Sequence, residues 1–288
     1  MTEFRSVESL FSRIDLTSYP LRLMVGIPIT VLLLAIAIIA LNGINLASDL
    51  QGGTLAIVEN ADIDESFSKE LNLHFKTSEI KVGITREGTR IDAPATIDAV
   101  ELKNFIQERF PQASISTSNI GPTMGRDLQR QAINALLLAF AGMTIVVFIV
   151  FRTPVPSFAV ILSAFSDIVI SMGFMSIFSI KLGLGTVAAL LMIIGYSVDS
   201  DILLTTRLLK RRGELSEKVR GAMITGVTMT STTLAAVVIL FLVSQHPSLD
   251  EIAIVLIFAL ATDLMNTWML NTGILMWYVK RIEKRRRR

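Results

Sequence analysis

The sequence predicts a polytopic α-helical membrane protein with six transmembrane helices and a small α+β domain between the first two. Three observations predict this fold class. Hydrophobic residues make up 51% of the 288 residues and charged residues only 18%, whereas soluble domains carry about 25% charged residues. Six apolar runs reach the roughly 20 residues that cross a bilayer. One long polar stretch separates the first run from the second.

The first apolar run, residues 21–41, is expected to be a retained membrane anchor. A cleaved signal peptide is the alternative. The apolar stretch within residues 21–41 is longer than the roughly 7 to 15 apolar residues usual in a signal peptide, and no small-residue cleavage site follows it. Residues 1–20 then form a segment on one side of the membrane.

Residues 128–279 are expected to contain the other five helices. The predicted bounds are about 128–151, 157–178, 183–206, 221–243 and 251–279. Pro154 and Pro156 leave room only for a tight turn between the second and third helices.

Lys and Arg residues gather on one side of this topology. They lie in the N-terminal segment, in the loop after the fourth helix and in the tail at residues 280–288, while the opposite short loops contain only Lys181. The positive-inside rule therefore places both termini in the cytoplasm and the chain in the cell membrane. Basic residues beside a membrane usually set topology and contact lipid headgroups, so a nucleic-acid partner is disfavoured and the lipid bilayer is the expected one.

Residues 42–127 are expected to fold as an extracytoplasmic α+β domain. Residues 54–59, 79–85 and 113–118 have the pattern of strands, while residues 95–110 and, more weakly, 63–73 have that of helices. Short strands and two helices in this order predict a ferredoxin-like layer.

Four aspartates lie within the predicted spans, where a charged side chain costs about 2.5 to 3.5 kcal/mol. Asp167 forms a polar stripe with Ser163 and Ser171, which should face other helices. Asp199 and Asp201 point roughly 200° apart on the fourth helix, because each residue adds about 100°. Asp199 is the deeper of the two and the preferred functional candidate. Asp201 is nearer the cytoplasmic end, where it could pair with Arg207 or be partly hydrated.

Hydroxyl residues on the fifth helix are candidate partners for these acids. Thr225, Thr228 and Thr232 share one face, and Asp263 forms a polar face with Asn266 and Thr267 on the sixth helix. Small hydroxyl residues also let helices pack closely, which is the alternative role for each of them. The proton-coupling candidates are therefore Asp199, Asp167, Asp263, Thr228 and Thr232.

Enzyme chemistry is not expected. The chain has no cysteine, Gly52 and Gly53 lack the G-x-G-x-x-G context, and no P-loop is present. No cofactor or metal is expected either.

Three motifs resemble those of the SecD and SecF family. Residues 49–54, which contain Asp49, Gly52 and Gly53, resemble its D-x-x-G-G-T motif. Gly121, Pro122 and Gly125 lie in a second matching segment, and Gly195 begins a third at residues 195–201. The single small outer domain resembles SecF rather than SecD. Val198-Asp199-Ser200-Asp201 and Thr225-Gly226 depart from many bacterial SecF sequences, which favours an archaeal member.

The resemblance implies six spans in the resistance-nodulation-division superfamily arrangement. It further implies a SecD-like partner, a neighbouring SecYE-type channel, and exported polypeptides as clients. Two other functions stay open at this point: a proton-coupled transporter of a small solute or lipid on the same helices, and a passive assembly factor for the channel.

The mechanistic hypothesis is that Asp199 gains and loses a proton among the third, fifth and sixth helices. Thr228 and Thr232 would bond to it, and its change of charge would drive motion of the domain at residues 42–127. The glycines of the first two motifs are expected to set the joints between domain and membrane, with a hinge as the alternative.

Overall fold

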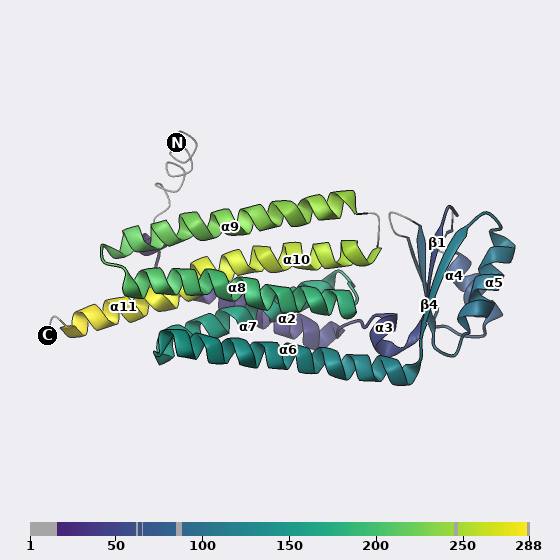
Figure 1. Ribbon diagram of the computed structural model, residues 1–288, viewed down its shortest axis with the longest axis horizontal. Coiled ribbons are helices and arrows are strands. Elements are labelled where there is room, and N and C mark those ends of the chain that lie inside the picture. The colour runs from purple at the N-terminus through teal and green to yellow at the C-terminus, as the bar shows by residue number, and fades with distance from the viewer. Residues whose placement is uncertain (1–15, 62, 65, 85–87, 245–246, 287–288) are drawn as a thin grey trace.

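The computed structural model describes residues 16–61, 63–64, 66–84, 88–244 and 247–286. It is elongated, with a helical bundle at one end and a small α+β domain at the other (Figure 1). Most of the predicted N-terminal segment, the last two tail residues and the end of the predicted strand at Thr85 lie outside the described residues.

Within the described residues, six helices are long and apolar enough to cross a membrane, which agrees with the predicted fold class. A 3₁₀ turn, η1 (Leu16–Ser18), precedes the first of them. The long helices are α2 (Leu21–Asn42), α6 (Pro122–Phe151), α7 (Pro154–Ile177), α8 (Leu184–Lys210) and α9 (Leu215–Val243), followed by one composite helix. That last helix consists of α10 (Pro247–Met265), the π-helical η2 (Asn266–Asn271) and α11 (Thr272–Arg286).

Helix α6 begins at Pro122, earlier than the predicted residue 128. Gly121 is extended before it, and proline suits the first turn of a helix because the N–H that it lacks has no partner there. At the other end, Arg152 adopts a left-handed conformation with φ of 51° and donates its N–H to Phe148 O. Helix α7 then begins at Pro154, so the predicted tight turn is present.

The α+β domain has the element order β1 (Gly53–Glu59), α4 (Ser66–His74), β2 (Lys81–Ile84), β3 (Thr89–Pro94), α5 (Ala99–Arg109) and β4 (Ser114–Ile120). Its antiparallel sheet has the strand order β2-β3-β1-β4. Helices α4 and α5 cover the face of the sheet that points away from the bundle (Figure 1). This is the ferredoxin-like arrangement that the sequence predicts.

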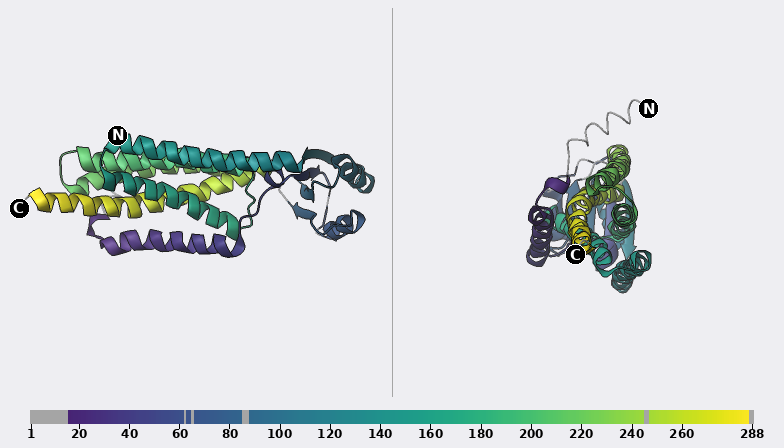
Figure 2. Two further views of the ribbon diagram at one scale, coloured as in Figure 1. Left: turned by 90° about the horizontal axis from the view of Figure 1, so that it is seen from below. Right: turned by 90° about the vertical axis from the view of Figure 1, so that its left-hand side faces the viewer.

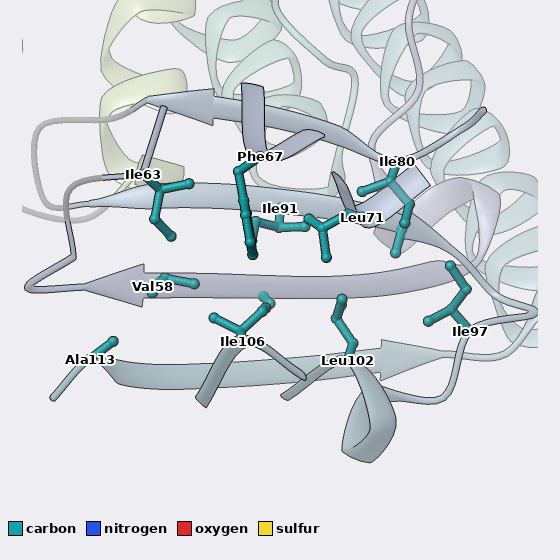
Figure 3. Close-up of a cluster of buried hydrophobic side chains, with 12 residues drawn as sticks. Val58, Ile63, Phe67, Leu71, Ile80, Ile91, Ile97, Leu102, Ile106 and Ala113 are labelled. Atoms are coloured by element: carbon teal, nitrogen blue, oxygen red, sulfur yellow. The ribbon is translucent and has the colours of Figure 1, made fainter. Parts of the chain in front are cut away.

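Strand β3 is the element of this domain that the sequence analysis missed. Ile91 and Ala93 face the core while Arg90 and Asp92 alternate with them, so two of the six residues of the strand are charged. Figure 3 shows the core that it joins, where Phe67 and Leu71 of α4 approach the sheet.

The bundle has an inner and an outer set of helices. In α7, α8 and the last helix, 56% of the most apolar stretch is buried, against 11 to 22% in α6, α9 and α2. Helix α2 lies on a flank of the bundle in both views of Figure 2. Helices α7, α8 and α10 therefore form the centre, where a polar side chain is shielded from lipid.

Candidate functional site

Three carboxylates lie in the centre of the bundle, one on each inner helix. They are Asp167 on α7, Asp201 on α8 and Asp263 on α10, and none is more than 1% exposed. We call this group the acid triad.

Asp167 is held by two donors from neighbouring helices. Ser197 donates its hydroxyl to Asp167 Oδ2 over 2.6 Å, and Asn266 donates its amide to Oδ1 over 2.7 Å. Ser163 and Ser171 on the same face are also buried. The predicted polar stripe of α7 therefore faces other helices.

Asp201 accepts hydrogen bonds from the last helix. Thr267 Oγ1 lies 3.0 Å and Asn271 Nδ2 lies 2.7 Å from Asp201 Oδ1. The expectation that Asp201 pairs with Arg207 or is partly hydrated is wrong, because Asp201 is fully buried and Arg207 instead donates to Gly221 O and to Thr225 Oγ1.

Asp263 connects to Asp201 through one shared hydroxyl. Thr267 Oγ1 lies 3.2 Å from Asp263 Oδ1 as well as 3.0 Å from Asp201 Oδ1. Ser200 Oγ lies 3.4 Å from the other oxygen of Asp263. A hydroxyl can donate one hydrogen bond and also accept one. Thr267 can therefore bond to both carboxyl groups at once when one of them is protonated and donates to the Thr267 oxygen.

The π-helical turn η2 supplies the amides and the bridging hydroxyl. Its wider turn brings residues five apart close to one face, so Asn266, Thr267 and Asn271 all reach the acid triad. Thr272 shows the same five-residue spacing, because its N–H and its hydroxyl both donate to the carbonyl oxygen of Thr267, five residues earlier. Such turns occur frequently at functional sites.

The acid triad is rich in acceptors and poor in donors. Three buried acceptor oxygens of the triad and of the amides beside it have no hydrogen-bond partner: Asp201 Oδ2, Asn266 Oδ1 and Asn271 Oδ1. Among the described residues, no Lys or Arg forms a salt bridge with any of the three acids. Charged carboxylates away from water need a partner, and a bound proton both removes the charge and supplies a donor. The described residues also contain no group of acids or histidines arranged to hold a metal ion. The geometry therefore suits the uptake and transfer of protons.

Asp199 lies on the outer face of α8 and is exposed, as is Gly195 one turn before it. The structure does not bring it together with Asp167 or Asp263, so Asp201 occupies the position expected for Asp199. The sequence contained a pattern that favours Asp201. Polar residues recur at helical spacing on its face of α8, as they do in the stripe on α7: Ser197, Ser200, Asp201 and Thr205. All four are buried.

Thr228 and Thr232 do not reach a carboxylate. Their hydroxyls donate to Ile224 O and Met229 O of their own helix, and both side chains are exposed. The inner face of α9 contains Gly226, where an added Cβ would lie 2.5 Å from Trp268 Cζ2. Because this close approach fixes the rotation of α9, Thr228 and Thr232 turn outward. The sequence analysis also missed Asn271. This residue lies five positions after Asn266, a spacing that does not fit the regular α-helical pattern.

The first motif joins the α+β domain to the bundle through Asp49. This residue lies in the short helix α3 (Ser48–Gln51), and its Oδ2 accepts the N–H of Leu184 over 2.7 Å. Leu184 is the first residue of α8, where backbone N–H groups lack partners inside the helix and favour a negative charge. Asp49 therefore anchors the joint to the helix that carries Asp201.

The motif glycines allow close backbone packing at the same joint. A Cβ on Gly125 of α6 would lie 2.3 Å from Gly52 N, and one on Gly53 would lie 2.7 Å from Ala93 O. Gly121, in contrast, has open space around it. Gly52 has a positive φ of 78°, which favours glycine. The first two motifs thus pack against each other where the domain meets the bundle.

Ion pairs form a second connection between domain and bundle. Arg90 of β3 lies 2.8 Å from Glu251 Oε1 of α10 and 3.1 Å from its neighbour Asp92. Lys181, in the loop before α8, also binds Asp92. Burial alone would raise the pKa of Asp92, but the charges of Arg90 and Lys181 and their hydrogen bonds hold it below its usual value. We call these four residues the docking cluster.

Comparison with known proteins identifies relatives along nearly the whole chain. A family model described as "Protein export membrane protein SecD/SecF, C-terminal" matches residues 101–281. A "Protein-export membrane protein SecF" of Methanolacinia petrolearia is 45% identical over 283 residues, which cover 93% of this chain and 97% of that protein. Its counterpart in Thermococcus gammatolerans is also 45% identical, over 90% of this chain and 85% of that protein.

Solved structures show the same fold. The crystal structure of SecDF, a translocon-associated membrane protein from Thermus thermophilus, matches 90% of this chain with a TM-score of 0.75 and 20% sequence identity. The present chain spans 38% of that longer chain.

Proposed function

Since the chain belongs to the SecD/SecF family of protein-export membrane proteins, we propose that it is a SecF-type accessory subunit of the Sec translocase. In this role it assists the export of proteins across the cytoplasmic membrane and is not an enzyme. The support is the similarity to proteins named SecF over at least 85% of the length of the two relatives described above.

The expected partners are a SecD-like subunit, a SecYE-type channel and the exported polypeptides. The support is that SecDF of Thermus thermophilus is a single chain of which this protein matches only a part. The exposed face of α8 at Gly195 and Asp199 is the proposed contact with the SecD-like subunit. A carboxylate near the middle of a membrane helix is costly against lipid, about 2.5 to 3.5 kcal/mol, so a partner or water should cover Asp199.

Both termini are proposed to lie in the cytoplasm and the α+β domain, residues 42–127, outside. The basic C-terminal part of α11 and the basic loop after α8 support this orientation, because they lie at the end of the bundle away from the domain (Figure 1). The domain would then face the side at which exported chains emerge.

The acid triad is proposed to couple this work to the proton gradient. The observation that carries the proposal is the hydrogen-bonded link from Asp201 through Thr267 to Asp263 in the centre of the bundle. A proton that crosses 100 mV releases about 2.3 kcal/mol. That free energy shifts a two-state equilibrium by roughly 50-fold, which is enough to bias the position of a small domain.

The helices that carry the acids also contact the domain or its joint. Helix α8 begins at the Asp49 anchor, the loop between α7 and α8 contains Lys181, and α10 contains Glu251 near its start. Asp201 lies about 25 Å from the start of α8 at 1.5 Å per residue. A helix is stiff over this length, so a shift at the triad can be transmitted to the docking cluster.

A gentle detergent pull-down of the tagged protein from its native membrane tests the export role. Recovery of a SecD-like protein with channel subunits is the expected result. Recovery with components of a solute transport system, or with no partner, would contradict it. The same experiment on Asp199→Lys tests the proposed contact, because a positive charge there should reduce recovery of the SecD-like protein while Lys284→Gln should not.

A further inference from the structure

A groove lies between α2 and α11 at the end of the bundle where the basic tail begins. It has a volume of about 510 Å³ and is mainly apolar, with Arg22 as its one charged lining residue. The other lining residues are Leu21, Val25, Gly26, Ile274 and Trp277. Its size falls within the range of pockets that bind small ligands, roughly 300 to 1,000 Å³.

Two glycines explain why the groove is open. At Gly273 the helices touch, since an added Cβ would lie 3.0 Å from Val25 Cγ2 and 3.3 Å from Met24 Cβ. At Gly26 an added Cβ would meet nothing within 4 Å. The close contact at Gly273 holds α2 and α11 together, and the missing side chain at Gly26 leaves the space beside it free.

A second cavity, of about 230 Å³, shares Trp277 with the groove. It is lined by Arg281 and Arg285 together with Val155, Tyr278 and Ile282. The Arg281 guanidinium lies 5.1 Å from the centre of the Trp277 ring, over its face. Trp277 therefore lines both the apolar groove and the basic cavity, and we call the two cavities together the path.

The basic end of this path has uncompensated positive charge. None of the described residues that line the two cavities is acidic, and none of the salt bridges among the described residues involves Arg22, Arg281 or Arg285. Trp and Tyr side chains concentrate at the level of lipid headgroups, and basic pockets between membrane helices bind anionic headgroups.

We propose that this path binds one anionic phospholipid. A hydrocarbon chain fills the groove at Gly26, and the phosphate binds Arg22, Arg281 and Arg285. A helix of another protein would fill the apolar groove equally well, but it would leave the three arginines without a counter-charge. The proposal concerns a surface remote from the acid triad and does not depend on the export role.

Native mass spectrometry of the purified and delipidated full chain tests the proposal. The probes are phosphatidylglycerol and phosphatidylcholine with the same acyl chains, and glycerol phosphate as the headgroup without a chain. We expect one phosphatidylglycerol to bind more tightly than phosphatidylcholine and glycerol phosphate not to bind. Equal binding of the two lipids, or binding of glycerol phosphate alone, would overturn the proposal.

Substitutions separate the two halves of the site. Arg281→Gln should weaken phosphatidylglycerol binding about fivefold, because a basic residue near the headgroups contributes about that factor, and should leave phosphatidylcholine unaffected. Lys284→Gln is the control, since Lys284 belongs to the same basic tail but lines neither cavity.

Gly26→Leu should fill the groove and reduce the binding of both lipids. Gly142→Leu is its control, because Gly142 also has open space around it but lies on α6. Unchanged lipid binding in Gly26→Leu would overturn the proposal. If that variant instead loses only its protein partner, the groove belongs to a partner helix and the proposal fails.

Discussion

Asn271 donates its side-chain amide to Asp201 over 2.7 Å and so connects the π-helical turn of the last helix to the centre of α8. Thr267, one position after the start of the same turn, bridges Asp201 and Asp263. The geometry of this turn therefore determines how the acid triad is connected, and a change of charge on Asp201 acts directly on the last helix.

The bridging hydroxyl can be removed without a change of shape. Thr267→Val should abolish most of the proton-gradient stimulation of export while the chain still folds, because valine keeps the volume but cannot pass a proton between Asp201 and Asp263. Export into membrane vesicles with and without an imposed gradient measures this. Thr262→Val is the matched control, since Thr262 lies five residues earlier in the same composite helix, on α10, but its hydroxyl donates to Phe258 O of its own helix. Equal stimulation in both variants would contradict a role for the link.

The joint between domain and bundle should tolerate no side chain at Gly125. Gly125→Ala should lower the free energy of unfolding by about 1 to 3 kcal/mol, because its Cβ would lie 2.3 Å from the backbone N of Gly52. Thermal unfolding in detergent measures the loss. Gly121→Ala, four residues earlier in the same motif and with open space around it, should have a much smaller effect.

The position of α9 should depend on Gly226 in the same way. Gly226→Ala should destabilise the bundle by about 1 to 3 kcal/mol, because the added methyl group would meet the Trp268 ring at 2.5 Å. Gly142→Ala lies in another membrane helix with open space around it and should be close to neutral. If the two variants unfold at the same temperature, Trp268 is free to move and does not fix the rotation of α9.

The docking cluster should make the position of the domain depend on pH. Because the pKa of Asp92 is lowered in the folded protein, its stabilisation is complete above the ordinary value of about 3.9 and is lost as pH falls through the lowered value. Burial raises the pKa of Glu251 in the same cluster, so Glu251 takes up its proton at a higher pH and contributes in the opposite sense. The loss of the Asp92 contribution should therefore appear as an increase in the spin-label distances between the domain and the bundle below about pH 4.

Asp92→Asn should weaken docking at neutral pH by about 1.5 to 3 kcal/mol, the contribution of hydrogen bonds to a charged group. Glu70→Gln is the control, because the Glu70–Arg109 pair is exposed and such pairs contribute less than about 1 kcal/mol. A domain that stays docked in Asp92→Asn would show that the Asp49 anchor and the glycine packing suffice.

The sequence predicted the membrane helices and most of the domain because hydropathy and period-2 alternation report burial directly. It missed β3, in which Arg90 and Asp92 bind Glu251 and Lys181 of the bundle. These charges are explained by contacts that are distant in sequence, so no local pattern could reveal them.

The candidate site was predicted in part. The stripe at Asp167 and the polar face at Asp263 pointed to the bundle centre, whereas the choice of Asp199 over Asp201 rested on depth and ignored the polar neighbours of Asp201 on its own face. The role expected for Thr228 and Thr232 failed because packing of Gly226 on Trp268 sets the rotation of α9. Depth along a helix was a poorer guide than the face shared with other polar residues.

Proton coupling through the acid triad can be measured as gradient-dependent export in cells that carry Asp201→Asn, with Asp199→Asn in parallel. Asparagine keeps the shape and the hydrogen-bonding capacity of the buried side chain but cannot take up a proton. We expect Asp201→Asn to abolish the stimulation of export by the proton gradient while the protein still assembles with its partners. Stimulation at the wild-type level in Asp201→Asn would contradict proton coupling through the acid triad.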